Sequence, residues 1–301
     1  MASAEIVALR AAFAQVNAQQ AGKVVSVQER RAAIEAATRG KALPAGCRFE
    51  ESVWGGIACE DITPARARPS RTIFYLHGGA FQTCSPRTHR APVALLADIA
   101  AARAVVVDYR LGPEHPYPAA AEDAVAAYLA LIETRKPSSI VVVGDSAGGG
   151  LALMLALRLK ARGAPQPAGY CLLSPWADFT QSARTYQTRA EADLLVSKER
   201  LDAVAAGYLA GHDPRDPLAS PVFGDFAGLA PMLVHVGADE VLLGDAIAIT
   251  EAAGAANVAV RLEVWPDMPH VWHNLFDRLE EGRRAMAVVG QWIAERLAEA
   301  E

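Results

Sequence analysis

The sequence predicts an α/β protein in which helices wrap a mostly parallel sheet. Apolar runs rich in β-branched residues at 72–76, 105–108 and 140–143 alternate with helical patterns, the order expected of parallel strands joined by crossover helices. The third run leads directly into the turn GDSAGGG at 144–150, and strong helix formers continue to Gly163. A strand, a sharp glycine-rich turn and a helix therefore stand at the centre of the predicted fold.

Helix and turn signals place the remaining elements. Ser26 and Glu29 have the spacing of a capping box, which opens a helix, and Ser85-Pro86 marks the start of another. Gly55-Gly56 separates two alternating segments, as in a β-hairpin. On these signals and on apolar periodicity, helices are expected over 3–18, 26–40, 85–102, 119–134 and 197–210, with a closing helix that holds 286–297, and strands over 48–54, 57–62, 170–173, 232–236 and 258–264.

The length and composition suit one large domain with an insertion, since 52% of the 301 residues are hydrophobic. Residues 176–225 lack a strand pattern and interrupt the alternation. We therefore divide the chain into an N-terminal helical cap segment (1–45), the first part of an α/β core (46–175), a cap insertion (176–225) and the second part of the core (226–301). The N-terminal helices form either part of a lid or a plain amphipathic support, and the sequence leaves both open.

The charge balance and hydropathy argue against two classes of protein. A net charge of −5 without a basic cluster is unlike a nucleic-acid-binding protein. Glu5 and Arg10 interrupt the first twenty residues, so a signal peptide is not expected, and the apolar run after Gly148 ends at Arg158, too soon to span a bilayer. We expect a soluble cytoplasmic protein without stable membrane insertion. Its four cysteines lack C-x-x-C spacing and are expected to be free thiols.

Ser146 is the predicted nucleophile. It is the central residue of a G-x-S-x-G pattern, and the flanking Gly144 and Gly148 let a strained turn present its hydroxyl above the sheet. A glycine-rich turn of this kind could also hold a phosphate. That alternative is disfavoured because no Lys-Ser/Thr pair follows Gly150 and the spacing G-x-G-x-x-G is missing.

A serine hydroxyl needs a base and a group that orients the base. Among the carboxylates we choose Asp239, which follows the strand at 232–236 on the edge where the Ser146 turn is expected; Glu240 and Asp245 are its rivals. Asp145 is adjacent to the nucleophile and is expected to point away from it, as an acceptor that stabilises the loop.

His270 is the predicted base, because it lies in a loop just past the last strand. His273 is three residues further on and is expected one turn into a helix, from which Ser146 is harder to reach. The chain order Ser146, Asp239, His270 is that of an α/β-hydrolase.

The oxyanion formed on attack needs backbone N–H donors, and glycine lets the main chain approach the substrate closely. The stretch from His77 to Ala80, reading HGGA, directly follows the strand at 72–76 and supplies such a loop.

Together these motifs resemble the hormone-sensitive-lipase-like esterases, bacterial lipolytic family IV, in the subgroup whose turn reads GDSAGG. The resemblance extends over nearly the full chain. Its motifs are HGGAF (77–81), YRLGPEHPYPAAAEDA (109–124), GDSAGGG (144–150), SPWADFT (174–180), DPLASPVF (216–223), VGADEVLLGDA (236–246) and PDMPHVW (266–272).

The family implies an α/β-hydrolase fold with about eight strands, a helical cap, and hydrolysis of short to medium acyl esters with neither cofactor nor metal. The oxyanion hole that the resemblance implies consists of Gly78, Gly79, Ala80 and Ala147, with the N–H groups of the last three as donors. The usual third glycine is Ala80 here, which preserves the donor provided that its φ is negative. The residues expected around the substrate are His77, Phe81 and Asp145, with Phe81 and the Ala80 methyl narrowing the acyl side.

The sequence thus predicts a serine carboxylesterase that works through an acyl-enzyme and prefers acyl chains of about two to eight carbons, without interfacial activation. Lactone or amide hydrolysis by the same triad is the alternative, because the fold hosts all three activities. A ligand receptor of the same fold that has lost catalysis is a remote alternative, since all three triad residues are present. The oligomeric state stays open, a homodimer included.

Overall fold

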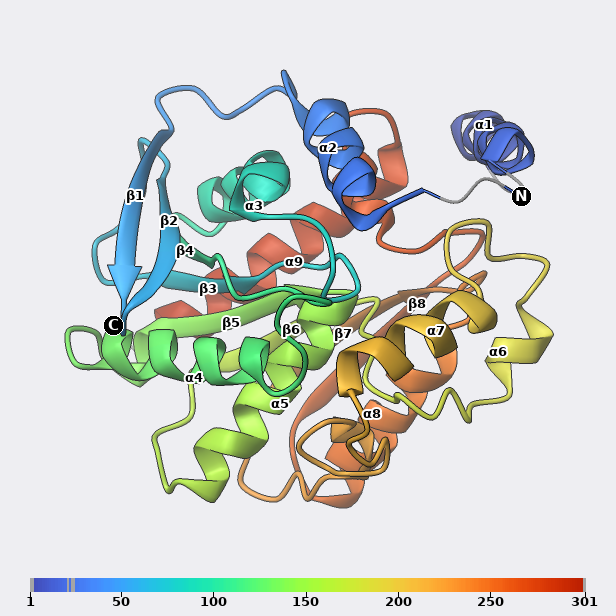
Figure 1. Cartoon of the computed structure of the whole chain (residues 1–301). Helices are drawn as coiled ribbons and strands as arrows, with labels where there is room; N and C mark the ends of the chain where they lie inside the picture. The colour runs from blue at the N-terminus through green and yellow to red at the C-terminus, as the bar shows by residue number, and fades with distance from the viewer. Residues whose placement is uncertain (1–2, 21, 23–24, 300–301) are drawn as a thin grey trace.

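A computed structural model describes residues 3–20, 22 and 25–299 of the chain. Its strands form one eight-stranded sheet in the order β1-β2-β4-β3-β5-β6-β7-β8 (Figure 1). β1 and β2 form the predicted hairpin, β2 also runs antiparallel to β4, and all other neighbours are parallel. The expected α/β-hydrolase fold is confirmed. The strands are β1 (Arg48–Trp54), β2 (Ile57–Thr63), β3 (Thr72–Leu76), β4 (Arg103–Val107), β5 (Ile140–Asp145), β6 (Gly169–Leu173), β7 (Met232–Gly237) and β8 (Val260–Trp265).

Helices cover both faces of the sheet. The described helices of more than one turn are α1 (Ala4–Gln20), α2 (Val27–Thr38), α3 (Pro86–Ile99), α4 (Ala119–Ile132), α5 (Ala147–Ala161), α7 (Lys198–Leu209), α8 (Leu243–Ala255) and α9 (Glu280–Ala298), and short turns form α6 (Thr185–Thr188), η1 (Pro137–Ser139), η2 (Pro221–Phe223) and η3 (Trp272–Leu275). The capping box predicted at Ser26 and Glu29 is present at the start of α2.

Alternation along the central strands builds two apolar layers. Ile73 and Tyr75 of β3 pack towards α3 and α9, whereas Phe74 and Leu76 pack towards α4 and α5. All five residues of β3 are buried, as expected for a parallel strand covered on both faces. The turns that follow these strands at their carboxyl ends are therefore anchored on the buried centre of the sheet.

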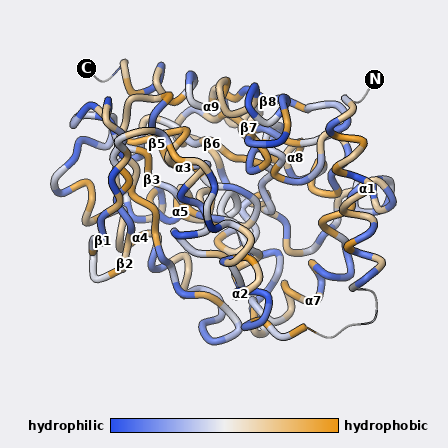
Figure 2. Tube along the Cα trace, turned by 90° about the horizontal axis from the view of Figure 1, so that it is seen from above, coloured by the Kyte–Doolittle hydropathy of each residue, from blue (hydrophilic) through white to orange (hydrophobic). Residues whose placement is uncertain are grey.

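The N-terminal helices and the segment around α7 lie outside these layers. In both views α1 lies towards β7 and β8, far from the hairpin of β1 and β2 (Figures 1 and 2). Residues 1–2, 21 and 23–24 of the expected N-terminal segment 1–45, and residues 300–301 of the last core part, lie outside the described residues. Among the described helices, none is both long enough and apolar enough to cross a membrane.

Candidate active site

Ser146 occupies the sharp turn between β5 and α5. Its backbone has φ 54° and ψ −123°, a conformation that costs a non-glycine residue of order 1–3 kcal/mol. A Cβ at Gly148 would lie 1.9 Å from the carbonyl oxygen of Leu76, and one at Gly144 would lie 2.2 Å from that of Gly148. Only glycine fits at these two positions, and the tight turn they allow brings the Ser146 hydroxyl to the end of the strand.

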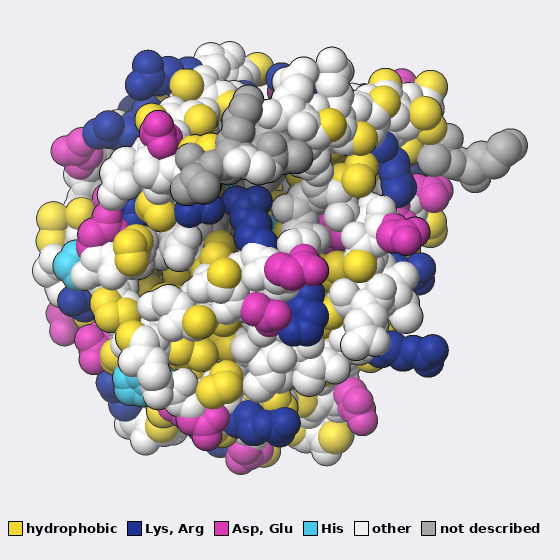
Figure 3. Space-filling view, turned by 45° about the vertical axis from the view of Figure 1, so that its right-hand side comes forward, with side chains coloured by type: hydrophobic (Ala, Val, Ile, Leu, Met, Phe, Trp, Pro, Cys, Tyr) yellow, Lys and Arg dark blue, Asp and Glu magenta, His cyan; other side chains and the backbone are white. Residues whose placement is uncertain are grey.

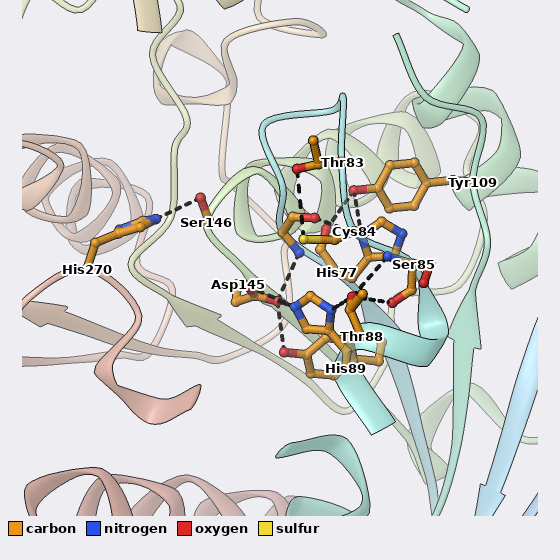
Figure 4. Close-up of polar contacts among 12 residues, drawn as sticks. His77, Thr83, Cys84, Ser85, Thr88, His89, Tyr109, Asp145, Ser146 and His270 are labelled. Atoms are coloured by element: carbon orange, nitrogen blue, oxygen red, sulfur yellow. Dashed lines mark hydrogen bonds and ion pairs between the residues drawn. The ribbon is translucent and has the colours of Figure 1, made fainter. Parts of the chain in front are cut away.

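His270 points at this hydroxyl from the loop that follows β8. Its Nε2 lies 2.9 Å from Ser146 Oγ (Figure 4), and its Nδ1 lies 2.7 Å from Glu240 Oε2. Burial opposes the charged imidazolium, but the hydrogen bond and the negative charge of Glu240 outweigh it, so the pKa of His270 lies above its ordinary value of 6.5. The structure therefore brings the predicted nucleophile and the predicted base into contact.

The third partner differs from the prediction: Glu240, not Asp239, contacts His270. The side chain of Asp239 is 18% exposed and forms an ion pair with Arg10 of α1. Glu240 is fully buried, and its Oε1 accepts from the N–H of Gly237 (2.6 Å) and from Ser174 Oγ (2.6 Å). The side chains of Asp239 and Glu240 point in different directions from the turn after β7. The hydrogen bonds from Gly237 and Ser174 hold the Glu240 carboxylate beside His270.

Ser174 was not predicted as a site residue, yet it joins the carboxylate to the loop of the base. Its hydroxyl donates to Glu240 Oε1 and accepts from the N–H of Val271 at 3.2 Å. Ser174 is fully buried and has φ 50°. The only signal in the sequence was its place at the end of a strand before Pro175.

The other candidates for the triad have different partners. Asp245 accepts from the N–H groups of Ala177 and Asp178, and burial raises its pKa to about 7. His273 is buried in η3, where its Nε2 lies 3.2 Å from Nδ1 of His235. Burial and the neighbouring His235 hold the pKa of His273 well below its usual range, so it is a neutral packing residue.

The loop after β3 presents backbone N–H groups beside Ser146. Gly78 is not a free donor, contrary to its inclusion in the predicted oxyanion hole, because its N–H donates to Asp145 Oδ1 at 3.0 Å. Among the described residues, the N–H groups of Gly79, Ala80 and Ala147 donate to no other group. The φ of Ala80 is 54°, not negative as expected; the loop turns back so tightly that the N–H groups of Gln82 and Thr83 both donate to the Gly79 carbonyl.

Asp145 acts as the predicted loop acceptor and also borders the cavity. Its carboxylate accepts from Tyr75 Oη (2.9 Å) as well as from Gly78 and lies 3.3 Å from His89 Nε2, facing away from Ser146 (Figure 4). Although burial works against its ionisation, the charge and hydrogen bond of His89 and the hydrogen bond from Tyr75 lower the pKa of Asp145 to about 2. The ionised carboxylate thereby fixes the loop that carries the free N–H groups.

A cavity of about 270 Å³ opens above Ser146 and His270. Two of the expected substrate contacts are absent from its wall. His77 is fully buried and stacks on Tyr109, with a ring separation of 4.3 Å, and Phe81 is fully buried and stacks on Tyr208 at 4.1 Å. The cavity is lined by Ile34, Gly79, Ala80, Thr83, Cys84, His89, Asp145, Ser146, Trp176, Leu195, Val196, Arg200, Leu201, Val204, Leu242, His270, Val271 and Asn274.

Neither a second hollow nor a cluster of metal-ligating side chains adds to this site among the described residues. A larger hollow of about 640 Å³ lies elsewhere, between Glu35, Glu51 and Arg87, and contains neither Ser146 nor His270. Within residues 3–20, 22 and 25–299, no three His, Cys, Asp or Glu side chains are arranged to hold a metal ion.

Comparisons with known proteins identify the family of the chain. The family model of the α/β hydrolase fold matches residues 73–274. The chain is 45% identical to an acetyl-hydrolase of Streptomyces hygroscopicus over 240 residues, which cover 79% of this chain and 80% of that protein. It is 38% identical to an esterase of Acinetobacter venetianus, over 79% and 78% of the two chains.

Solved structures are similar over nearly the whole length. EstE5, in a crystal soaked with p-nitrophenyl butyrate, is 39% identical with a TM-score of 0.93 and coverage of 99% of this chain and 100% of that one. An esterase of the bacterial hormone-sensitive lipase family is 38% identical with a TM-score of 0.93 and coverage of 99% of each chain. The protein thus belongs to the hormone-sensitive lipase family of esterases, within the α/β-hydrolase fold, and is a carboxylic ester hydrolase.

Proposed function

We propose that Ser146, His270 and Glu240 form the catalytic triad of this esterase. Ser146 Oγ attacks the ester carbonyl while His270 Nε2 takes the hydroxyl proton, and Glu240 holds the imidazole and stabilises its charged form. His270 then delivers the proton to the leaving alcohol, and water hydrolyses the acyl-enzyme by the same steps. The observation that carries this proposal is the continuous contact from Ser146 Oγ through both ring nitrogens of His270 to the buried Glu240.

The N–H groups of Gly79, Ala80 and Ala147 are the proposed donors to the oxyanion. Ala80 remains a donor in this proposal despite its positive φ, because its N–H donates to no other described group and the residue lines the cavity. All three belong to residues that line the cavity or adjoin Ser146, and Ala147 is the first residue of α5, where the helix dipole favours negative charge. One such donor is worth about 10²–10³-fold in kcat in other hydrolases.

Trapping the acyl-enzyme tests the nucleophile. An organophosphonate should add one covalent group to the protein, detected by intact-mass spectrometry and mapped to the peptide that contains Ser146. Ser146→Ala should remove both this labelling and hydrolysis of p-nitrophenyl butyrate, because the change deletes only the attacking hydroxyl. Labelling of the variant at full stoichiometry would show that another residue is the nucleophile.

We further propose that the substrates are short acyl esters. A cavity of about 270 Å³ lies just below the range of about 300–1,000 Å³ usual for drug-sized ligands. Its wall is mostly apolar, and the acetyl-hydrolase name of the Streptomyces relative supports a small acyl group. Rates on p-nitrophenyl esters should peak between about two and eight carbons, since each methylene left in water forgoes about 0.8 kcal/mol. A panel that adds a lactone and an anilide separates the alternative activities, and a jump in rate above the micellar concentration would contradict a closed pocket.

We also propose that the expected cap forms one side of this pocket. Ile34 comes from the N-terminal segment 1–45, and Leu195 and Val204 come from the insertion 176–225; all three line the cavity above Ser146. The GDSAGG subgroup, the cytoplasmic location and a homodimer stay predictions from the sequence. Cell fractionation and light scattering test the last two.

A further inference from the structure

The apolar wall of the active-site cavity carries one cationic side chain, Arg200. It lies near the start of α7 and lines the same cavity as Ser146 and His270. Figure 3, which turns this side of the molecule forward, shows a hollow with an apolar floor and Lys or Arg side chains at its rim. An uncharged acyl ester would offer the Arg200 guanidinium no charged partner.

A second guanidinium, that of Arg30, belongs to the same side of the cavity, because Arg30 lies one turn before Ile34 on α2 and Ile34 lines the cavity. Partial burial and, less strongly, the positive charge of Arg30 on α2 lower the pKa of Arg200. Arg30 approaches Gln82 Oε1 only at 3.5 Å, and its Nε is buried without a hydrogen-bond partner among the described residues. The two positive charges are thus close enough to repel each other, and an anion bound between them would relieve this repulsion.

Nothing in the described part of the chain neutralises these two arginines. Neither guanidinium lies within 4.0 Å of a carboxylate there, whereas the neighbouring Arg31 holds both oxygens of Glu114 at 2.9 and 2.8 Å. The positive charges of Arg30 and Arg200 are therefore not used in ion pairs that stabilise the described part of the chain.

The carboxylates around the cavity are committed elsewhere. Asp145 accepts from Tyr75 and Gly78, and Glu240 is bound by His270. Asp193 accepts from the N–H groups of Leu195, Val196 and Val241. The positive charge at the entrance is therefore left for the substrate.

We propose that Arg200 and Arg30 form a subsite for a carboxylate, so that the preferred substrates are short esters that carry a carboxylate group away from the scissile bond. Guanidinium groups bind carboxylates through paired N–H donors, which gives both attraction and orientation. The cavity then holds the acyl group beside Ser146 while the carboxylate lies at the arginine pair. This proposal rests on the proposed function, because it places the ester at the Ser146 triad.

Pairs of isosteric substrates test it, one pair for each side of the ester. On the alcohol side the pair is 3-acetoxybenzoate and 3-acetoxybenzamide. On the acyl side it is monoethyl glutarate and its uncharged amide, ethyl 4-carbamoylbutanoate. The quantity measured is the ratio of kcat/KM for the carboxylate to that for the amide. This ratio does not depend on the fraction of enzyme that is folded, so a poorly folding variant cannot imitate the result.

In the natural protein the ratio should exceed one in at least one pair and should fall as salt is added. Arg200→Gln and Arg30→Gln should each lower it about tenfold, the order expected when a charge-assisted hydrogen bond is lost. Arg184→Gln is the matched control, because Arg184 is also exposed in the insertion and lines none of the cavities described above. It should leave the ratio unchanged.

A ratio at or below one in both pairs, or one that neither substitution lowers, would overturn the subsite. If the uncharged esters are still hydrolysed in that case and Ser146→Ala abolishes the reaction, the proposed function stands without the subsite. Loss of Ser146-dependent hydrolysis for every substrate would instead refute the proposed function itself. Equal effects of the Arg184 control would assign the change to net charge and would also reject the subsite.

Discussion

Replacing Glu240 by glutamine removes one charge and tests the triad at the point where sequence and structure differ. Glu240 Oε1 accepts from the N–H of Gly237, and Oε2 faces His270 Nδ1 at 2.7 Å. A glutamine must keep its carbonyl oxygen towards Gly237, so its NH₂ group is turned towards Nδ1. Nδ1 then becomes an acceptor, and the ring proton moves to Nε2, the atom that has to take the proton of Ser146.

The expected loss follows from this change of tautomer. An imidazole with its proton on Nε2 cannot act as the base, and the corresponding acid-to-amide change in a serine protease lowers kcat about 10⁴-fold. We expect a loss of about 10³–10⁴-fold in kcat for Glu240→Gln, which corresponds to about 4–5.5 kcal/mol in activation free energy. The fold should persist, because the side chain keeps its size and both hydrogen bonds at Oε1.

Asp239→Asn is the matched control, one residue away in the same turn. Asp239 forms an ion pair with Arg10 in which the side chains are 18% and 33% exposed, and pairs of this kind contribute up to about 1 kcal/mol. The control should therefore change kcat by less than about fivefold. Steady-state kinetics on p-nitrophenyl butyrate and thermal unfolding of both variants give the comparison.

The pH profile supplies a second readout. The interactions with Glu240 raise the pKa of His270, whereas burial lowers it. With the charge gone, burial remains, so the rising limb of kcat/KM in Glu240→Gln should move to lower pH. If Asp239→Asn instead causes the large loss while Glu240→Gln stays near the natural rate, the assignment of Glu240 is wrong.

Three further outcomes are expected. In the natural protein, kcat/KM should rise with pH through a single pKa above 6.5, because only neutral His270 accepts the proton; a flat profile across that range would exclude an imidazole base. His270→Ala should lower kcat by about 10³-fold or more, and His273→Ala far less; the reverse order in the kinetics would move the base to His273. Ser174→Ala should lower kcat about tenfold with little change in KM, since it frees both Glu240 and the N–H of Val271; an unchanged kcat and pH profile would limit Ser174 to packing.

The turn at Ser146 and the position of His270 beside it could be predicted because each has a local signature in the sequence. Glycines are required at positions 144 and 148 because a Cβ there would clash with neighbouring carbonyl oxygens, and His270 follows the last strand in a loop that reaches Ser146. Adjacent strands of a parallel sheet end at one edge, so the order of strands places both residues in the same region.

The carboxylate that contacts His270 could not be identified from the sequence in the same way. Asp239 and Glu240 are consecutive in one turn, and the position relative to β7 is equally good for both. What separates them is a pair of long-range contacts: Arg10 lies 229 residues from Asp239, and Ser174 lies 66 residues from Glu240. Neither partner is marked by a local pattern.

The residues that line the cavity could not all be predicted from the sequence either. Phe81 follows the oxyanion loop directly, which suggested a contact with the substrate. With φ 57° at Phe81 and φ 54° at Ala80, the chain turns the ring inward onto Tyr208, and Trp176 from the segment after β6 lines the cavity instead. A positive φ changes the direction in which a side chain points. Because positive φ is uncommon for residues such as alanine and phenylalanine, the sequence does not indicate it at these positions.

The strained residues of the site are held by the sheet itself. Ser146 and Ser174 both have positive φ, and each lies one residue past the end of a central strand. The N–H of Ser146 donates to the carbonyl of Leu173 at 2.8 Å, and that of Ser174 donates to the carbonyl of His235 at 2.7 Å. The parallel ladder therefore continues one residue into each turn. Strain persists only where the surroundings over-determine it, and here the ladder of β5, β6 and β7 fixes Ser146, Ser174 and the strand before Glu240 relative to one another before any substrate binds.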